Sequence, residues 1–328
     1  MILYAISLMG ELFVNKRALI VSYEGEFYFP TYGDQISGKK FGLDYEYETN
    51  YRDLQKKFER ESSPNWLLMP IVPFDPYEMD YANESSTGFS PPSFTSGHFC
   101  GTDKTERDVF ARLLYGFRIA MTFSLGYLIL TYLIAICVGS IMGYFGGKTD
   151  ILGLRLVEIW ANVPFLYMVI ILVSVMPSWW GIGWRVSSLL IIMVLFSWTG
   201  MTYYIRAAVY KEKARDYVSA AKVIGASSSR IIFRHLLPNV ISTLVTFAPF
   251  TIAAAVSSIT ALDFLGYGLP PPTPSWGELL KQGVNNLRIA PWIVISSVTI
   301  LVLTLTLVTF VGEAVREAFD PKKFSIYE

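Results

Sequence analysis

The stretch Asp216–Asn239, which reads DYVSAAKVIGASSSRIIFRHLLPN, separates two long apolar runs of the chain. It is too polar to cross a bilayer and too apolar for a disordered loop. Gly225 can end one helix, because glycine accepts the left-handed backbone of a helix C-terminus. Ser227–Ser229 can start a second helix, and Pro238 marks the start of the next apolar run. The pattern predicts a helix–turn–helix held at the membrane surface.

Small residues give this stretch a low-profile face. Ala220, Ala221 and Gly225 stand at positions i, i+1 and i+5. On a helix the first and last of them lie within about 140° of each other. Another surface can approach such a face closely, so the stretch is predicted to be a docking platform.

The composition indicates an integral membrane protein. Of 328 residues, 52% are hydrophobic and the mean hydropathy is +0.40, above the usual soluble composition. The 27 basic and 27 acidic residues balance, which gives no electrostatic reason to expect nucleic-acid binding. Two cysteines and two histidines form no recognisable metal site or disulfide framework.

Five apolar runs reach the roughly 20 residues that a bilayer span requires. The first 13 residues, Met1–Phe13, cover only about 20 Å as a helix. They are predicted to be part of a first span whose remainder lies outside this sequence, with an interfacial helix as the alternative. The expected fold is an all-α membrane protein with about six spans, the first incomplete. The five complete runs are Phe117–Tyr144, Ile151–Met176, Val186–Ala208, Val240–Leu262 and Trp292–Gly312.

Residues 14–105 are more polar and rich in aromatic residues, glycine and proline. Ala18–Tyr23 and Phe27–Tyr32 flank a central glycine, a pattern typical of a β-hairpin. Asn50–Glu61 reads as a charged helix. A connector of about 90 residues is too long to be plain loop. The chain is therefore predicted to have three parts: a partial first helix at 1–13, a small α+β insert at 14–105, and a transmembrane domain at 106–328.

Lysine and arginine counts predict the orientation, because cytoplasmic loops carry the excess. Residues 206–234 hold seven of them and residues 316–323 hold three. The links 177–185 and 263–291 hold only one and two. The coupling stretch 209–239 and the C-terminus are therefore expected in the cytoplasm, and the insert on the outside.

This arrangement resembles the permease subunit of a type I ABC importer. The family's EAA motif reads E-A-A, three residues, Gly, nine residues, then I-x-L-P. Here the same spacing gives Ser219-Ala220-Ala221, Gly225 and His235-Leu236-Leu237-Pro238. Ser219 replaces the usual glutamate and His235 the usual isoleucine.

Two other segments narrow the resemblance to the oligopeptide and dipeptide permeases. Gly101–Gly116 is similar to the segment that leads into their second span, with Glu106 where the family usually has glycine. Phe264–Gly277 is similar to their outer loop before the last span. The hairpin of the insert further resembles the subgroup associated with microcin C and related peptides.

The resemblance implies a permease that works with several partners in the bacterial cytoplasmic (inner) membrane. These are a second permease subunit, ABC ATPase subunits, an external solute-binding protein, a peptide-like substrate and membrane lipid. The chain has no Gly-x4-Gly-Lys-Ser/Thr phosphate loop. We therefore expect no catalytic residue, metal or cofactor on this chain, with ATP bound and hydrolysed by a partner.

The resemblance also implies roles for individual residues of the coupling stretch. Ala220, Ala221 and Gly225 are expected to form the surface that an ATPase contacts. Arg230 and Pro238 are expected to fix the angle of this surface to the following span. The full set of predicted coupling residues is Tyr217, Ala220, Ala221, Gly225, Arg230 and Pro238.

Two residues are candidates for the substrate path. Pro164 is expected to kink its helix and shape the cavity. Asp263, at the outer end of its span, either meets a peptide amino group or ends a helix near water, and the sequence does not separate these roles.

The rival prediction is a self-sufficient secondary transporter or channel. Such a protein is expected to show inverted repeats, broken spans and a relay of charges at the midplane. The sequence shows no repeat and few midplane charges, so the importer subunit is the favoured hypothesis.

Overall fold

A computed structural model describes residues 2–61, 64–80 and 88–318 of the chain. It divides into two compact units, and the helices α3, α10 and α12 contribute residues to both. The last part of the predicted basic tail, from residue 319 onward, lies outside the described residues. Unit 1 comprises Met1–Ala120, Asp263–Leu265 and Pro271–Leu301, and unit 2 comprises Met121–Leu262, Gly266–Pro270 and Val302–Glu328.

Unit 1 contains the predicted hairpin. The strands β1 (Ile20–Tyr23) and β2 (Glu26–Tyr28) pair antiparallel, with Tyr23 opposite Glu26. The two turn residues Glu24 and Gly25 both have positive φ, which matches the tight hairpin turns that favour glycine. A third strand, β3 (Trp66–Leu68), pairs with the other side of β1 and was not predicted.

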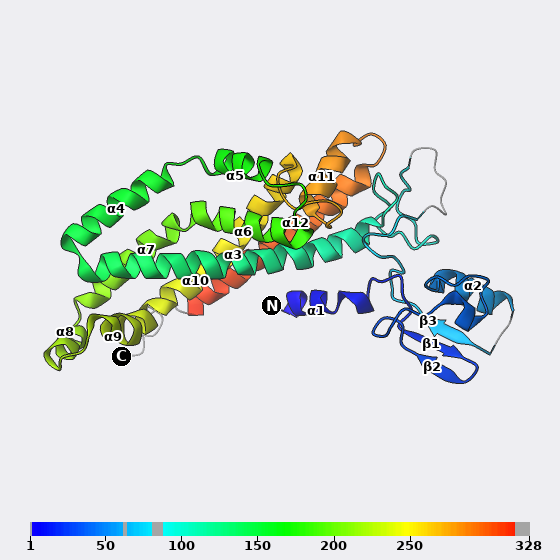
Figure 1. The fold of residues 1–328 in the computed structure, drawn as a ribbon, viewed down its shortest axis with the longest axis horizontal. Helices are drawn as coiled ribbons and strands as arrows, with labels where there is room; N and C mark the ends of the chain where they lie inside the picture. Colours follow the sequence, from blue (N-terminus) through cyan, green and yellow to red (C-terminus); the bar gives the residue numbers. More distant parts are fainter. Residues whose placement is uncertain (1, 62–63, 81–87, 319–328) are drawn as a thin grey trace. The chain divides into compact units, whose positions relative to one another are not determined.

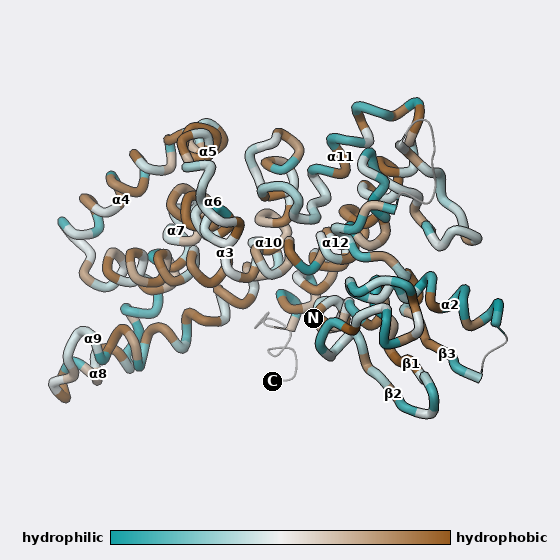
Figure 2. The backbone as a smooth tube through the Cα atoms, turned by 45° about the vertical axis from the view of Figure 1, so that its right-hand side comes forward, coloured by the Kyte–Doolittle hydropathy of each residue, from teal (hydrophilic) through white to brown (hydrophobic). Residues whose placement is uncertain are grey.

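One face of this sheet packs on the helix α2 (Tyr51–Arg60), as Figure 1 shows. The helix begins where expected, because the Asn50 side chain accepts hydrogen bonds from the backbone N–H groups of Arg52 and Asp53. In Figure 2 this helix is mostly hydrophilic. Only its inner side is apolar, so the insert has a small core of its own. The buried residues of this core are Ala18, Val21, Phe41, Tyr51, Leu54 and Phe58.

The start of the chain forms short helical segments. The helix α1 spans Ile2–Leu8 and is followed by the 3-10 helix η1, Gly10–Leu12. Neither is long enough for a candidate span among the described residues. The predicted partial first span at residues 1–13, like the other predicted domain boundaries, stays a prediction.

Three of the five predicted complete spans are single apolar helices, and the other two correspond to bent pairs of helices. Among the described residues, three helices are long and apolar enough to cross a membrane, and five spans result if each of two bent pairs is one span. Figure 2 shows the strongly hydrophobic character of α3. The three long helices are α3 (Val109–Phe145), the continuous segment Ser228–Leu265 that ends with α10 (Leu237–Leu265), and α12 (Pro291–Ala318).

Only one of the two bent pairs has a proline at its break. The pair α4 (Gly147–Ala161) and α5 (Phe165–Ser174) bends by 67°, and Pro164 stands at the break as the residue before α5. This confirms the kink expected at Pro164, since proline cannot continue the hydrogen-bond ladder. The pair α6 (Ile182–Ser197) and α7 (Thr199–Lys213) bends by 50° at Trp198, with no proline to mark it.

Two of the buried clusters in unit 2 bear on the candidate site and its surroundings. In one of them Phe123 of α3 meets residues of α5, α6 and α10. In the other, Tyr132 and Tyr144 of α3 pack with Ile205 and Val209 of α7 and with the segment after α7. The second cluster supports the stretch that the sequence singled out.

Unit 1 also contains α11 (Trp276–Asn285), a short helix inside the Pro-rich link between α10 and α12. Ser275 caps it by accepting a hydrogen bond from the Glu278 backbone N–H at 3.3 Å. Trp276 donates from its indole nitrogen to the Leu113 carbonyl, 2.9 Å away. A Cβ added at Gly116 would lie 3.0 Å from the Trp276 ring, so the glycine permits this close approach.

Candidate functional site

The predicted helix–turn–helix is present. The helix α8 spans Asp216–Val223, and its C-terminus has the hydrogen bonds of a Schellman motif. The Ala226 N–H donates to the Ala221 carbonyl and the Gly225 N–H to the Lys222 carbonyl, both at 3.0 Å. Gly225 has a φ of +85°, the left-handed conformation that side chains rarely adopt. The expectation that Gly225 ends the helix is confirmed.

The second helix starts at the predicted serines. Ser227 accepts a hydrogen bond from the Arg230 backbone N–H and caps α9 (Ser228–Arg230). A π-helical segment, η3 (Ile231–Leu236), follows and runs directly into α10. Pro238 has no N–H, and its ring needs room beside the carbonyl four residues earlier, which a wider turn supplies. Pro238 therefore lies inside a continuous helix rather than at its start.

The underside of the helix–turn–helix is buried. Val218 and Ala221 of α8 pack against Ile231 and Leu236 of η3 and against Ile205 of α7. Ala221 is only 8% exposed. The small side chain of Ala221 thus lets α8 pack on its own unit, and Ala221 does not belong to an accessible contact surface as predicted.

The opposite side of the turn is an exposed apolar tip. Val223 is 89% exposed and Ile224 is 86% exposed, at the end of α8 and just before Gly225. Ala220 and Gly225 are also exposed. No heavy atom lies within 4 Å of a Cβ built on Gly225, so the space beside it is open. We call Val223, Ile224 and Gly225 the α8 tip.

Tyr217 ties this surface to the rest of unit 2. Its hydroxyl donates to Glu212 Oε2 at 3.0 Å, and Asn239 Nδ2 donates to the same hydroxyl at 3.1 Å. Burial raises the pKa of the Tyr217 phenol, which keeps it a neutral donor to Glu212. The α8 tip is therefore linked through Tyr217 to the end of α7 and the start of α10.

The remaining predicted coupling residue, Arg230, is exposed at the end of α9. Its backbone N–H takes part in the cap described above. The predicted role of its guanidinium in setting the angle to the next span stays a prediction.

The two predicted path residues lie in different units. Pro164 is an exposed residue of unit 2, whereas Asp263 belongs to unit 1 and is 8% exposed. The Ser275 hydroxyl donates to Asp263 Oδ2. Asp263 therefore helps to hold the capping residue of α11 and is buried, so the alternative that it ends its own helix near water is wrong. Its contact with substrate stays a prediction.

A group of buried charged residues in unit 1 was not predicted from the sequence. Arg112 is fully buried, and its Nη2 donates to Glu278 Oε2 of α11. Arg107, 7% exposed, donates to Asp103 Oδ2 at 2.8 Å and to Glu278 Oε1 at 3.3 Å. We call Asp103, Arg107, Arg112 and Glu278 the Arg112 cluster. It joins the start of α3 and the residues before it to α11, and so connects Gly101–Gly116 to the residue that directly follows Phe264–Gly277.

The backbone conformation at Glu106 explains why related permeases usually have glycine at this position. Glu106 has a φ of +58°, so this position needs the left-handed conformation for which glycine is best suited. Its N–H donates to the Asp103 carbonyl at 3.0 Å. The turn forms despite the missing glycine and positions Asp103 next to Arg107.

The chain is similar to known transport proteins over almost its whole length. Residues 135–325 match the family described as "Binding-protein-dependent transport system inner membrane component". The chain belongs to this family. The matched residues include the whole helix–turn–helix and its Tyr217 contacts, so this permease carries the candidate site in the family's shared region.

Curated relatives confirm the assignment. The permease is 39% identical to the "Inner membrane ABC transporter permease protein YejE" of Escherichia coli (strain K12), over 98% of this chain and 91% of that protein. It is 37% identical to the "Peptidoglycan transport system permease protein YejE" of Agrobacterium fabrum, over 98% and 88%. It is 33% identical to the "Oligopeptide transport system permease protein OppC" of Escherichia coli (strain K12), over 78% and 82%.

A solved structure supports the fold alone. The permease resembles a chain of the inward-facing MetNI methionine ABC transporter with a TM-score of 0.51 and 16% sequence identity. The likeness covers 63% of this chain and 96% of that chain. The predicted fold of a type I ABC importer subunit, with a small sheet added, is confirmed. The permease is a multi-pass inner-membrane transport component.

Proposed function

We propose that this permease is one of two transmembrane subunits of an ATP-driven importer for peptides or peptide-like compounds. A solute-binding protein delivers substrate on the outer face, and partner ATPase subunits bind and hydrolyse ATP. Closure of the ATPases pushes the helix–turn–helix, and the spans alternate between outward- and inward-open states. In this proposal ATP is bound and hydrolysed by the partner subunits, and the permease is expected to supply no catalytic residue or cofactor.

The names of the relatives support the substrate class. The three proteins cited above are named for ABC transport, peptidoglycan transport and oligopeptide transport. A dipeptide permease of Lactococcus lactis is 35% identical over 68% of this chain. Peptides and peptide-containing fragments are the chemistry shared by those names that state a substrate.

The α8 tip is the observation that carries the proposal for coupling. Two almost fully exposed aliphatic side chains stand at the end of a short helix whose other side is buried. Burying such residues in a partner's groove is favourable by about 25 cal/mol per Å² of apolar surface. The excess of basic residues in 206–234 supports a cytoplasmic position for the tip and for the C-terminus, where an ATPase is available.

The contacts behind the tip suit the transmission of force. Tyr217 connects the tip to α7 and α10 by hydrogen bonds, and Val218 and Ala221 connect it through packed side chains. A packed interior transmits displacement because it has low compressibility. A push on α8 is therefore passed to two spans at once, which is what alternating access requires.

The test is ATP hydrolysis in a reconstituted complex of this permease, its partner permease, the ATPases, the binding protein and peptide. Ile224→Asp is expected to lower the peptide-stimulated rate by about tenfold, because a central apolar contact is replaced by a charge. The control is Ile71→Asp, which makes the same change at a 68% exposed residue of the insert. Equal rates for the two variants, or no ATPase bound by the wild-type permease, would contradict the proposal.

Gly225 provides a second, shape-matched pair. Gly225→Asp is expected to uncouple transport and leave membrane insertion intact, because it places a charge beside the tip. Gly225→Asn has the same shape, and asparagine and aspartate both tolerate the left-handed backbone. The neutral variant is thus expected to keep most of the stimulated rate. If both variants transport peptide like the wild type, the tip does not contact the ATPase.

A further inference from the structure

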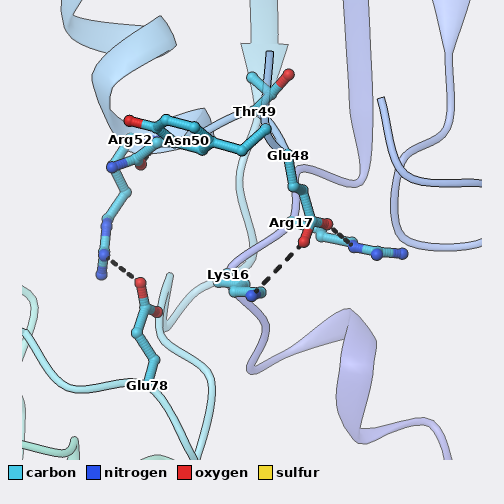
Figure 3. A pocket seen from close by; sticks show the side chains of 8 residues that line it. Lys16, Arg17, Glu48, Thr49, Asn50, Arg52 and Glu78 are labelled. Carbon is cyan, nitrogen blue, oxygen red and sulfur yellow. Dashed lines mark hydrogen bonds and ion pairs between the residues drawn. The ribbon is translucent and has the colours of Figure 1, made fainter. Parts of the chain in front are cut away.

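The insert contains a polar cavity that the importer cycle described above does not use. It has a volume of about 240 Å³ and lies beside the start of α2. Figure 3 shows its charged residues in two groups: Arg17 and Lys16 both pair with Glu48, and Arg52 pairs with Glu78. The volume is sufficient for a small organic group together with a few waters.

Of the three cations, Lys16 makes the longest ion pair, and it shares its carboxylate with Arg17. Arg17 Nε lies 2.5 Å from Glu48 Oε1, and Arg52 Nη2 lies 2.7 Å from Glu78 Oε1. Lys16 Nζ is 3.7 Å from Glu48 Oε2, beyond hydrogen-bond distance. Three cations face two carboxylates, so the cavity has an excess charge of about +1 when all five are ionised.

The two arginines are held in place before any ligand arrives. Arg17 Nη1 donates to the Pro30 carbonyl at 3.3 Å. Arg52 Nη1 donates to the Pro73 carbonyl at 3.3 Å, and its guanidinium lies 4.5 Å from the centre of the Phe74 ring. Fixed donors lose little entropy on binding, whereas Lys16, with a 45% exposed side chain, can turn towards a ligand.

The acidic groups limit which anion fits. Burial raises the pKa of Glu78 although Arg52 lowers it, so this carboxylate is less readily ionised than an ordinary glutamate. Glu48 accepts from Arg17 and would repel a doubly charged phosphate. With both glutamates ionised the excess is about +1, and a single carboxylate matches this charge better than a dianion does.

Tyr47 adds an aromatic ring to the lining of the cavity. Tyr47 is 69% exposed, and its ring stacks on Tyr45 with the ring centres 4.0 Å apart. A ring in the lining of a cationic cavity favours a ligand whose carboxylate is attached to a bulkier organic group.

We infer that this cavity binds the C-terminal carboxylate of a short peptide through Lys16, with Arg17 and Arg52 as flanking cations. The inference rests on the proposed peptide substrate and adds a second place, on the insert, where the permease meets peptide. The insert then retains peptides near the permease through the one group that all linear peptides share.

The test measures binding of a defined probe to the full-length permease in detergent micelles, by ligand-observed NMR. N-acetyl-alanyl-alanine carries only the carboxylate, and N-acetyl-alanyl-alaninamide is its uncharged match. The acid is expected to bind at least about tenfold more tightly than the amide, because charge-assisted hydrogen bonds are lost. Its affinity is expected to fall with added salt. Equal binding of acid and amide, or no binding of the acid, would overturn the inference.

Two substitutions are expected to change the affinity for the acid probe in opposite directions, which makes the test more specific. Lys16→Met keeps the aliphatic stem and removes the charge, and is expected to weaken acid binding about tenfold. Glu78→Gln removes a competing carboxylate and is expected to strengthen it several-fold. The control is Lys39→Met, which removes an exposed lysine of the insert that pairs with Glu46. If Lys39→Met weakens binding as much as Lys16→Met does, a general surface charge, and not the cavity, attracts the peptide.

The outcome is separable from that of the importer test. If peptide stimulates the ATPase but the acid probe does not bind, the cavity inference fails and the proposed function stands. If the acid binds through Lys16 but no ATPase associates, the cavity is a peptide site on a protein with another role. Competition by acetate at the concentration of the probe would show that the carboxylate alone is recognised, which supports the inference.

Discussion

The α8 tip lies in the stretch that resembles the EAA motif, and three residues of the Arg112 cluster lie in the segment that resembles peptide permeases. The side chains of the two regions are nevertheless used in opposite ways. At the tip, Val223 and Ile224 are exposed while the helix behind them is fixed. In the cluster, Arg107 and Arg112 are buried and their donors are directed at Asp103 and Glu278. A fixed segment with exposed apolar atoms has contacts left to make with a partner. A segment whose charges are neutralised internally serves to hold its own unit together.

The largest effect is expected from breaking the Arg112 cluster. Glu278→Gln keeps the shape of the side chain but leaves two buried arginines without their shared carboxylate. We expect a loss of about 3–5 kcal/mol in the free energy of unfolding, the usual cost of removing one partner from a buried ion pair. Thermal unfolding of the purified permease measures it.

The control for this substitution is Glu313→Gln. Glu313 pairs with Arg316 at 3.8 Å on an exposed face of α12, where an ion pair contributes about 1 kcal/mol or less. If the two variants unfold at the same temperature, the cluster does not stabilise unit 1 and the contrast with the tip is lost.

A second prediction concerns His98, which stands between two carboxylates. Its Nδ1 lies 2.8 Å from Asp108 Oδ2 and its Nε2 lies 3.2 Å from Asp80 Oδ2. Burial disfavours the imidazolium and lowers the pKa, but the hydrogen bonds to Asp108 and Asp80 outweigh it and raise the pKa of His98 to about 9. The charged form therefore stabilises the folded state.

The direction of the pH dependence follows from the raised pKa. The stabilising contribution is complete below the unfolded value of about 6.5 and is lost as the pH rises through about 9. The shift corresponds to roughly 3 kcal/mol. His98→Gln is expected to remove this dependence from thermal unfolding curves measured between pH 6 and pH 10, and His235→Gln to leave it unchanged. A wild-type curve as flat as that of His98→Gln would contradict the prediction.

The smallest effect is expected at Glu106, within the turn that positions Asp103. Glycine adopts the φ of +58° without strain, whereas glutamate does not. Glu106→Gly is expected to stabilise the permease by about 1 kcal/mol or less, since the relief of strain is partly offset by the greater freedom of the unfolded chain. The melting temperature measures it, and a clear decrease would show that the glutamate side chain makes a compensating contact.

The sequence predicted those features that depend on local composition or local backbone chemistry. The five complete spans follow from the length of the apolar runs, and the bend before α5 follows from Pro164. The turn at Gly225 and the cap at Ser227 follow from the preferences of these residues. Each of these signals acts within a few residues of the position it determines.

Features that depend on distant contacts were missed or misplaced. Arg112 and Glu278 are 166 residues apart, and no local pattern connects them. Ala221 has the composition of a contact residue, but packing against Ile231 and Leu236 decides that it faces inward. The helix α11 did carry a local signal, because Ser275 and Glu278 have the spacing of a capping box. The resemblance of Phe264–Gly277 to an outer loop did not indicate this helix.

The π-helical segment Ile231–Leu236 has a consequence for how the permease tolerates changes in chain length. A π turn accommodates one residue more than an α turn, and one residue corresponds to about 100° of rotation about a helix axis. A deletion of one residue within this segment converts it to regular α-helix and turns everything before it, including Val223 and Ile224, towards a different side of α10. The direction in which the permease presents its apolar tip is thus determined by the number of residues before Pro238. Two otherwise identical sequences present the tip differently if one of them has lost a single codon in this segment.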